Sequence, residues 1–182
     1  THLDVQKYDI LVAAGGHGEL FEKLDGKGVK SARIRHFSNI PGIKNILAFI
    51  EILRAIIKAK PDILYLLSSE AGFTGSLAGR FCRLIFWRRT PKIIYRIGGW
   101  AFKEPRNVVV KKIYLLAERI SAPFKDVIIV NSEFDRRLGI RHKIARENKL
   151  ITIYNGLDFQ ELKFMPRETA RQLLFRTKAS VS

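Results

Sequence analysis

Short apolar runs alternate along the chain with longer stretches in which apolar residues recur at a helical period. The run YDILVAA ends at Gly15 and Gly16, as a buried parallel strand followed by a tight turn would. The same pattern predicts strands at residues 8–14, 32–36, 63–67, 92–97, 127–130 and 150–154, and helices at 19–25, 45–60, 72–88, 108–122 and from 133 onward. This alternation predicts an α/β fold, a Rossmann-like three-layer αβα sandwich around a parallel sheet of about six strands.

Small, polar or aromatic residues directly follow the predicted strands. In parallel α/β sheets, ligands bind at the carboxyl ends of the strands, so these residues form the expected rim of a site. The candidates after the first strand are Gly15, Gly16, His17 and Gly18, and those after the later strands are Ser69, Glu70, Gly98, Gly99, Trp100, Ser132, Asn155 and Gly156.

The first glycine loop has the chemistry of a phosphate-proximal turn, because glycines let backbone amides approach an anion at the start of a helix. A tight strand-to-helix turn is the simpler interpretation. The loop lacks the third glycine of a dinucleotide fingerprint and the GK[ST] of a P-loop. Arg35 and His36 end the second strand where an acid would hold the ribose of NAD. An NADP-dependent reductase therefore stays open as an alternative function.

Three rim residues have two interpretations each. Trp100 either forms a stacking wall for a sugar ring or is a buried tryptophan in a turn. Glu70 either binds hydroxyls or a cation, or is a favourable charge at a helix N-terminus. Ser132 suits the N-cap of the helix that starts at Glu133, besides a place on the rim.

The chain is strongly basic, with 33 Lys and Arg against 17 Asp and Glu and a formal net charge of +16. Such an excess attracts nucleic acid, anionic lipid or a diphosphate ligand. A basic nucleotide-fold module that binds nucleic acid is a second alternative, although no nucleic-acid-binding motif is present. Aromatic and basic side chains interleave at the end of one predicted helix and indicate an anionic membrane surface, namely Phe86, Trp87, Arg88 and Arg89.

Other residue classes narrow the choices. The single cysteine, Cys82, cannot form an internal disulfide, and no secretory signal or membrane span is predicted, which favours the reducing cytoplasm. The four histidines show no metal-ligand spacing, so no metal site is expected.

Five segments in order resemble the N-terminal domain of family 4 glycosyltransferases, retaining enzymes with the two-lobed GT-B fold. They are AAGGHGEL at 13–20, KPDILYLLSSEAGFTGSLAGR at 60–80, PKIIYRIGGWAF at 91–102, KDVIIVNSEFDRRLGI at 125–140 and ITIYNGLD at 151–158. The closing Asn-Gly-x-Asp is similar to a sequence that family members commonly have where the chain leaves the first lobe. The resemblance covers residues 8–158.

The resemblance implies a retaining, hexosyltransferase-type reaction. A sugar would pass from a nucleotide-sugar donor to a lipid-linked or saccharide acceptor in polysaccharide or glycolipid biosynthesis, without a metal or other cofactor. Gly15–Gly18 would lie near the donor diphosphate, and the later rim residues would face the acceptor cleft. Gly98 and Gly99 stand where many relatives have a histidine that contacts the transferred sugar, so no catalytic residue is assigned.

The resemblance also implies a division of the chain. Residues 1–158 would form the acceptor-side domain, and residues 159–182 a linker or the truncated start of the donor-binding domain. That donor lobe would be supplied in cis or by a separate subunit, so this chain alone is not expected to complete the reaction. The expected location is cytoplasmic and peripheral, at the inner face of the cell membrane, with no nucleic-acid partner.

Overall fold

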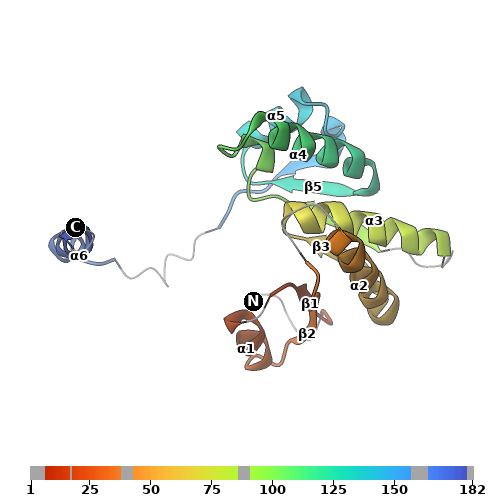
Figure 1. Cartoon of the computed structure of the whole chain (residues 1–182), viewed down its shortest axis with the longest axis horizontal. Helices are drawn as coiled ribbons and strands as arrows, with labels where there is room; N and C mark the ends of the chain where they lie inside the picture. The colour runs from red at the N-terminus through yellow and green to blue at the C-terminus, as the bar shows by residue number, and fades with distance from the viewer. Residues whose placement is uncertain (1–6, 17, 38–42, 86–90, 157–163, 180–182) are drawn as a thin grey trace.

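The computed structural model describes residues 7–16, 18–37, 43–85, 91–156 and 164–179. Strands and helices alternate through these ranges (Figure 1). In chain order they are β1 (Leu11–Ala14), α1 (Glu19–Asp25), β2 (Lys30–Arg33), α2 (Ile43–Ala59), β3 (Ile63–Leu66), α3 (Ser69–Ile85), β4 (Lys92–Arg96), η1 (Ala101–Lys103), α4 (Val108–Ser121), η2 (Ala122–Phe124), β5 (Val127–Val130), α5 (Glu133–Arg141), η3 (Glu147–Lys149), β6 (Leu150–Thr152) and α6 (Arg167–Ala179).

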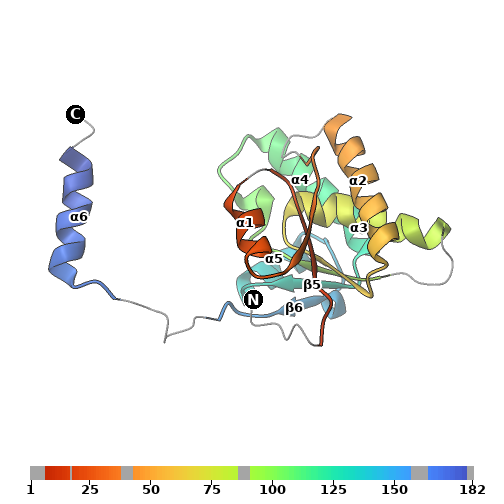
Figure 2. The ribbon, with the colours of Figure 1, turned by 90° about the horizontal axis from the view of Figure 1, so that it is seen from below.

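Every strand pairing is parallel, which confirms the predicted α/β class. The six strands divide between two sheets, however: β1 pairs with β2, and the other four lie in the order β3-β4-β5-β6. The β1–α1–β2 unit lies beside the larger body, and α6 lies apart from both (Figures 1 and 2). The apolar pattern predicts how many strands form, but it does not say which strands pair with each other, so it could not predict that the sheet divides.

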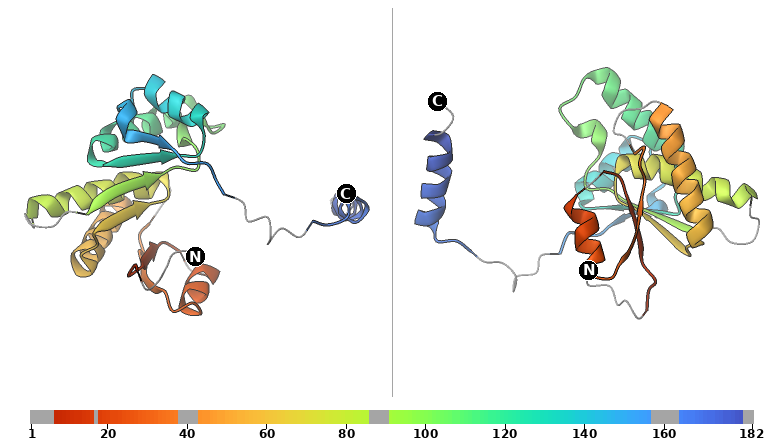
Figure 3. Two further views of the ribbon diagram at one scale, coloured as in Figure 1. Left: turned by 180° about the vertical axis from the view of Figure 1, so that it is seen from behind. Right: turned by 60° about the horizontal axis from the view of Figure 1, so that its bottom comes forward.

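The main core lies on one face of the four-stranded sheet. Alternate side chains of the strands point to this face and are buried, and α3, α4 and α5 follow successive strands. The buried strand residues are Leu66, Ile93, Tyr95, Ile128, Val130 and Leu150. The intervening residues on the other face include Ile63, Tyr65 and Ile151, which are exposed. The left view of Figure 3 shows β3, β4 and β5 side by side, with α3 lying alongside them.

Small residues bring α3 close to the sheet. A Cβ built on Gly75 would lie 2.6 Å from Leu66 Cδ2, and one built on Gly79 would lie 2.8 Å from Ile93 Cδ1. A side chain at either position would force Leu66 or Ile93 to shift. Because these positions are glycines, α3 can lie this close to β3 and β4.

The helix α2 packs on α3 in a second, smaller core. Ile56 of α2 is buried with Ala78 and Cys82 of α3, and the rings of Phe49 and Phe81 meet edge to face at 5.9 Å. One side of α2 is thus buried, while Ile46 on the outside is exposed. Among the described residues, no helix has both the length and the apolar composition needed to cross a bilayer.

Helix boundaries differ from the predicted ones by a few residues. The helix α3 begins at Ser69, three residues earlier than predicted, because the Ser68 hydroxyl accepts a hydrogen bond from the Ala71 amide and caps the first turn. The helix α6 lies within residues 159–182, which the sequence assigns to a linker or to the start of another domain. That assignment stays a prediction.

We predict that Gly72→Ala destabilises the fold by about 1–3 kcal/mol, the usual cost of forcing extra atoms into a packed core. A Cβ at Gly72 would stand 2.4 Å from Cε2 of Tyr95, a fully buried ring whose hydroxyl is held by a hydrogen bond. Urea unfolding measures the change. Gly98→Ala is the matched control, since its Cβ would meet nothing within 4 Å. Equal stability of the two variants would contradict this account.

Candidate functional site

A pocket of about 570 Å³ opens at the carboxyl ends of β3 and β4. Three segments build it: the turn from β3 into α3, the turn that follows β4, and the loop that leads into α4. Its lining residues are Leu67, Ser68, Ser69, Glu70, Tyr95, Ile97, Gly98, Gly99, Trp100, Ala101, Lys103, Glu104, Arg106 and Tyr114. The pocket thus occupies the end of the sheet where α/β folds bind ligands.

Five of the rim residues predicted from the sequence meet in this pocket. They come from the ends of two neighbouring strands and are Ser69, Glu70, Gly98, Gly99 and Trp100. Ser69 and Glu70 form the first turn of α3, where a carboxylate also suits the helix dipole. Gly98 and Gly99 are exposed, and a Cβ on either would meet nothing within 4 Å. Their lack of side chains leaves that space to the pocket.

Trp100 is a core residue that borders the pocket. It is 2% exposed, and its indole Nε1 donates a hydrogen bond of 2.9 Å to the Asp135 carbonyl. The ring stacks on Phe102 with 5.7 Å between centroids. Of the two interpretations of Trp100, these contacts favour the buried tryptophan, because a ring with so little exposed surface offers no open face to a sugar.

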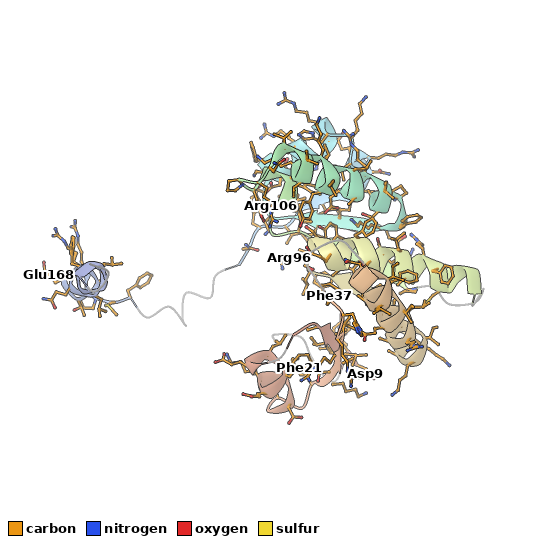
Figure 4. The ribbon with its side chains drawn as sticks, viewed as in Figure 1. Asp9, Phe21, Phe37, Arg96, Arg106 and Glu168 are labelled. Atoms are coloured by element: carbon orange, nitrogen blue, oxygen red, sulfur yellow. The ribbon has the colours of Figure 1, made fainter. Side chains whose placement is uncertain are left out.

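The loop between β4 and α4 supplies pocket residues that sequence reasoning missed. The short helix η1 turns the chain, and Asn107 caps α4 by accepting a 2.8 Å hydrogen bond from the Val109 amide. This path places Lys103, Glu104 and Arg106 on the pocket. Arg106 is labelled in Figure 4. The sequence feature that could have indicated these pocket residues is the pair of basic residues after Gly98-Gly99-Trp100, namely Lys103 and Arg106. Neither residue directly follows a predicted strand, so the search of strand ends did not include them.

Ion pairs hold the basic residues of the loop. Lys103 Nζ lies 3.2 Å from Asp135 Oδ1, and Arg106 Nη2 lies 2.7 Å from Glu104 Oε2. Both basic side chains remain partly exposed, at 40% and 45%. The hydrogen bond from Arg106 to Glu104 raises the pKa of the guanidinium, so its positive charge is secure. The pocket mouth therefore carries two cations that solvent and a ligand can reach.

A buried polar network supports the pocket floor. The Tyr95 hydroxyl donates to Glu118 Oε1 at 2.8 Å, and Lys125 Nζ donates to Glu118 Oε2 at 2.9 Å and to the Ser121 hydroxyl at 3.0 Å. The same ammonium lies 3.9 Å from the centroid of the Tyr95 ring. Strand β4, helix α4 and the turn after η2 are thereby joined by one set of contacts. Among the described residues, no buried side-chain nitrogen or oxygen lacks a hydrogen-bond partner.

Burial changes the titration of this network. Desolvation raises the pKa of the Tyr95 hydroxyl well above its ordinary value, and the negative charge of Glu118 adds to that effect. Desolvation lowers the pKa of the Lys125 ammonium, while Glu118 opposes the shift. Tyr95 therefore stays a neutral hydrogen-bond donor at the pocket floor.

The first glycine loop does not line this pocket. Gly16 and Gly18 have positive φ angles of 81° and 136°, so the turn itself requires glycine. A Cβ on Gly15 would lie 2.8 Å from the Cβ of Phe37, so close packing accounts for that glycine. His17 lies outside the described residues, as do Phe86, Trp87, Arg88 and Arg89. A role for the glycine loop near a donor diphosphate stays a prediction.

The remaining rim candidates do not line the pocket either. The Ser132 hydroxyl accepts a 3.1 Å hydrogen bond from the Asp135 amide, which confirms it as the N-cap of α5. Asn155 accepts a 2.6 Å hydrogen bond from Arg96, and Gly156 beside it is exposed. Arg96 belongs to β4 and links the end of that strand to the chain that leaves β6 (Figure 4).

No group of three histidine, cysteine or carboxylate side chains within reach of one metal ion occurs in the described ranges. The residues that line the pocket offer hydroxyls, two carboxylates, two cations and open backbone. Such a set recognises a polar ligand that carries both hydroxyl groups and negative charge. The class of protein so defined is a parallel α/β domain with a polar pocket at its strand ends.

Comparison with known proteins assigns the family. The family model of Glycosyltransferase Family 4 matches residues 1–161, and the chain belongs to this family. The crystal structure of Anabaena Alr3699/HepE in complex with UDP and glucose superposes with a TM-score of 0.64 at 22% identity, over 91% of this chain and 42% of that one. This likeness supports the fold.

Two curated relatives are similar in sequence. The Escherichia coli "UDP-Gal:alpha-D-GlcNAc-diphosphoundecaprenol alpha-1,3-galactosyltransferase" is 26% identical over 167 residues, which is 88% of this chain and 40% of that protein. The Klebsiella pneumoniae "Uncharacterized 41.2 kDa protein in cps region" is 30% identical over 125 residues, or 68% of this chain and 34% of that protein. The chain thus spans well under half the length of the relatives it matches. The family does not favour the nucleic-acid-binding or NADP-dependent alternatives.

We predict that Glu118→Ala destabilises the protein by about 3–5 kcal/mol, because it leaves a fully buried ammonium without its counter-charge. Chemical denaturation followed by fluorescence measures the loss. The control is Glu19→Ala, which breaks a solvent-exposed pair with Lys23 and should leave stability nearly unchanged. A small effect of Glu118→Ala would show that Lys125 finds another partner or loses its proton.

Proposed function

We propose that this domain is the acceptor-binding lobe of a glycosyltransferase and that the pocket at the ends of β3 and β4 holds the acceptor. The observation that carries the proposal is the joining, in one pocket, of Glu70, the open glycine pair and the two loop cations. A carboxylate and serine hydroxyls suit sugar hydroxyls, and the cations suit an acceptor that carries phosphate. Membership of the family supports the reaction class.

The proposed reaction transfers a sugar from a nucleotide-sugar to a lipid-linked or saccharide acceptor. The name of the Escherichia coli relative, which contains an acceptor joined through diphosphate to undecaprenol, supports a lipid-linked one. Lys103 and Arg106 would bind the acceptor phosphates, and Glu70 with Ser68 and Ser69 would bind hydroxyls of its sugar. The charges of the loop would thereby hold the acceptor in place while the donor is brought to it.

The donor side of the reaction is assigned to a second lobe, in the same polypeptide or in a separate subunit. UDP in the crystal structure of Anabaena HepE supports a nucleotide-sugar as donor. Fixed dipoles and cations can stabilise a departing diphosphate, so we propose a reaction that needs no metal cofactor. Membership of the family is the ground on which we also propose retention of the anomeric configuration. The proposed setting is the biosynthesis of a polysaccharide or glycolipid at the cytoplasmic face of the cell membrane.

We predict that Arg106→Ala, in the full-length protein, raises the KM for a lipid-diphosphate-linked sugar acceptor about tenfold, as expected for the loss of a charge-assisted hydrogen bond. The KM for the nucleotide-sugar donor should change little. Steady-state transfer assays with each substrate varied in turn separate the two constants.

The matched control for this experiment is Arg137→Ala, which removes an exposed arginine from α5, away from the pocket. Both variants lose the same charge, so a general electrostatic effect would change their kinetics alike. A rise in the donor KM alone would place the acceptor elsewhere and contradict the proposal.

A further inference from the structure

An apolar stripe, here called the α4 stripe, runs along the outer side of α4; it consists of Val109, Ile113, Leu116 and Ile120. These residues recur at spacings of four, three and four, so they share one side of the helix over about 16 Å. Each is 50–64% exposed. The opposite side of α4 holds Glu118 and Ser121 in the core, so the stripe is not part of the helix packing.

Basic side chains border the α4 stripe. Lys112 and Arg119 are exposed, and they lie four and three residues from Leu116, so both stand beside the stripe. The one acid of the helix, Glu118, is buried and paired with Lys125. The exposed surface of α4 is thus apolar along its centre and positive along one border.

The positive border continues beyond the helix. Arg119 Nε donates a 2.8 Å hydrogen bond to the carbonyl of His142, which joins the end of α4 to the end of α5. Arg141 and Lys143, on either side of His142, are exposed. Three exposed cationic side chains, Arg119, Arg141 and Lys143, therefore stand at the end of α4 and around the end of α5.

We infer that the α4 stripe is a docking surface for an anionic membrane, with α4 lying in the plane of the lipid headgroups. Apolar side chains with a cationic border are the arrangement by which a helix lies at a lipid interface, because the apolar residues enter the acyl boundary and the cations meet the phosphates. The net charge of +16 favours the same partner. A second copy of the chain fits less well, because it would bring the cations of one copy against those of the other. A stable dimer also buries about 800 Å² per partner, more than four side chains of one helix provide.

The stripe lies close to the pocket along the chain. Two residues that line the pocket are near the start of α4: Arg106 comes just before the helix, and Tyr114 is in its second turn. Val109 and Ile113 of the stripe belong to the same part of the helix. The N-terminal end of the α4 stripe is therefore the end nearer to the pocket. The inference goes beyond the proposed function, because it concerns a surface that is separate from the acceptor pocket and holds for any acceptor.

The test is vesicle sedimentation of the full-length protein without any acceptor. We expect binding to vesicles of phosphatidylcholine with phosphatidylglycerol and weaker binding to phosphatidylcholine alone. Ile113→Ser with Leu116→Ser should reduce the partition coefficient on the anionic vesicles about tenfold, because two apolar groups leave the interface. Lys112→Glu should weaken binding to the anionic vesicles and leave binding to neutral ones unchanged.

The matched control is Ile151→Thr with Ile153→Thr, which removes two isoleucines of similar exposure, 45% and 49%, from β6 and the chain beyond it. It should bind as the unaltered protein does. Thermal melts show whether each variant folds. If the variant with Ile113→Ser and Leu116→Ser melts at a lower temperature than the unaltered protein, the vesicle binding of Lys112→Glu tests the inference instead. Because no acceptor is present, failure here leaves the acceptor proposal to be judged by its own kinetics.

Three outcomes would overturn the inference. Unchanged binding of the serine variant would exclude the α4 stripe, and an equal loss in the β6 control would indicate unspecific adsorption. Self-association without vesicles, abolished by the serine substitutions, would make the stripe an interface between two copies of the chain.

Discussion

Much of this domain depends on the buried ion pair between Lys125 and Glu118. Glu118 also accepts a hydrogen bond from the Tyr95 hydroxyl. A buried pair of this kind contributes little net stability, but it penalises any arrangement that separates its members. Because Tyr95 is on β4, Glu118 on α4 and Lys125 before β5, the pair fixes how α4 lies on the sheet. The helix can then neither slide nor rotate without leaving a charge unpaired.

The same constraint shapes the pocket. Tyr95 forms part of its floor. Because Gly72 has no side chain, the first turn of α3 can pack directly against the Tyr95 ring at the end of β4. Ser69 and Glu70 are brought to the pocket by that approach. Burial keeps the Tyr95 hydroxyl neutral by raising its pKa, and the floor therefore donates a fixed hydrogen bond inward rather than presenting a charge to the ligand.

The spacing of apolar residues, together with the glycines and prolines that end each run, predicts the order of strands and helices, because each element has its own apolar pattern. The run before Gly15 is an example. These features also found five residues of the pocket, since a strand's end marks its rim. They could not find Arg106, which reaches the pocket only through the turn of η1 and the cap at Asn107. They could not show that Trp100 is turned into the core either, because its surroundings come from α5, about 35 residues further along the chain.

The helix α4 shows why a surface is harder to predict than a core. Its apolar residues occur nearly all around the helix, so periodicity alone does not distinguish the side facing the sheet from the side facing outward. Two polar residues decide the matter: Glu118 must face Lys125, and that orientation turns the side through Ile113 and Leu116 away from the sheet. The α4 stripe is therefore a consequence of the buried pair. The charge that fixes the pocket floor also determines which apolar side of the helix is left for a membrane.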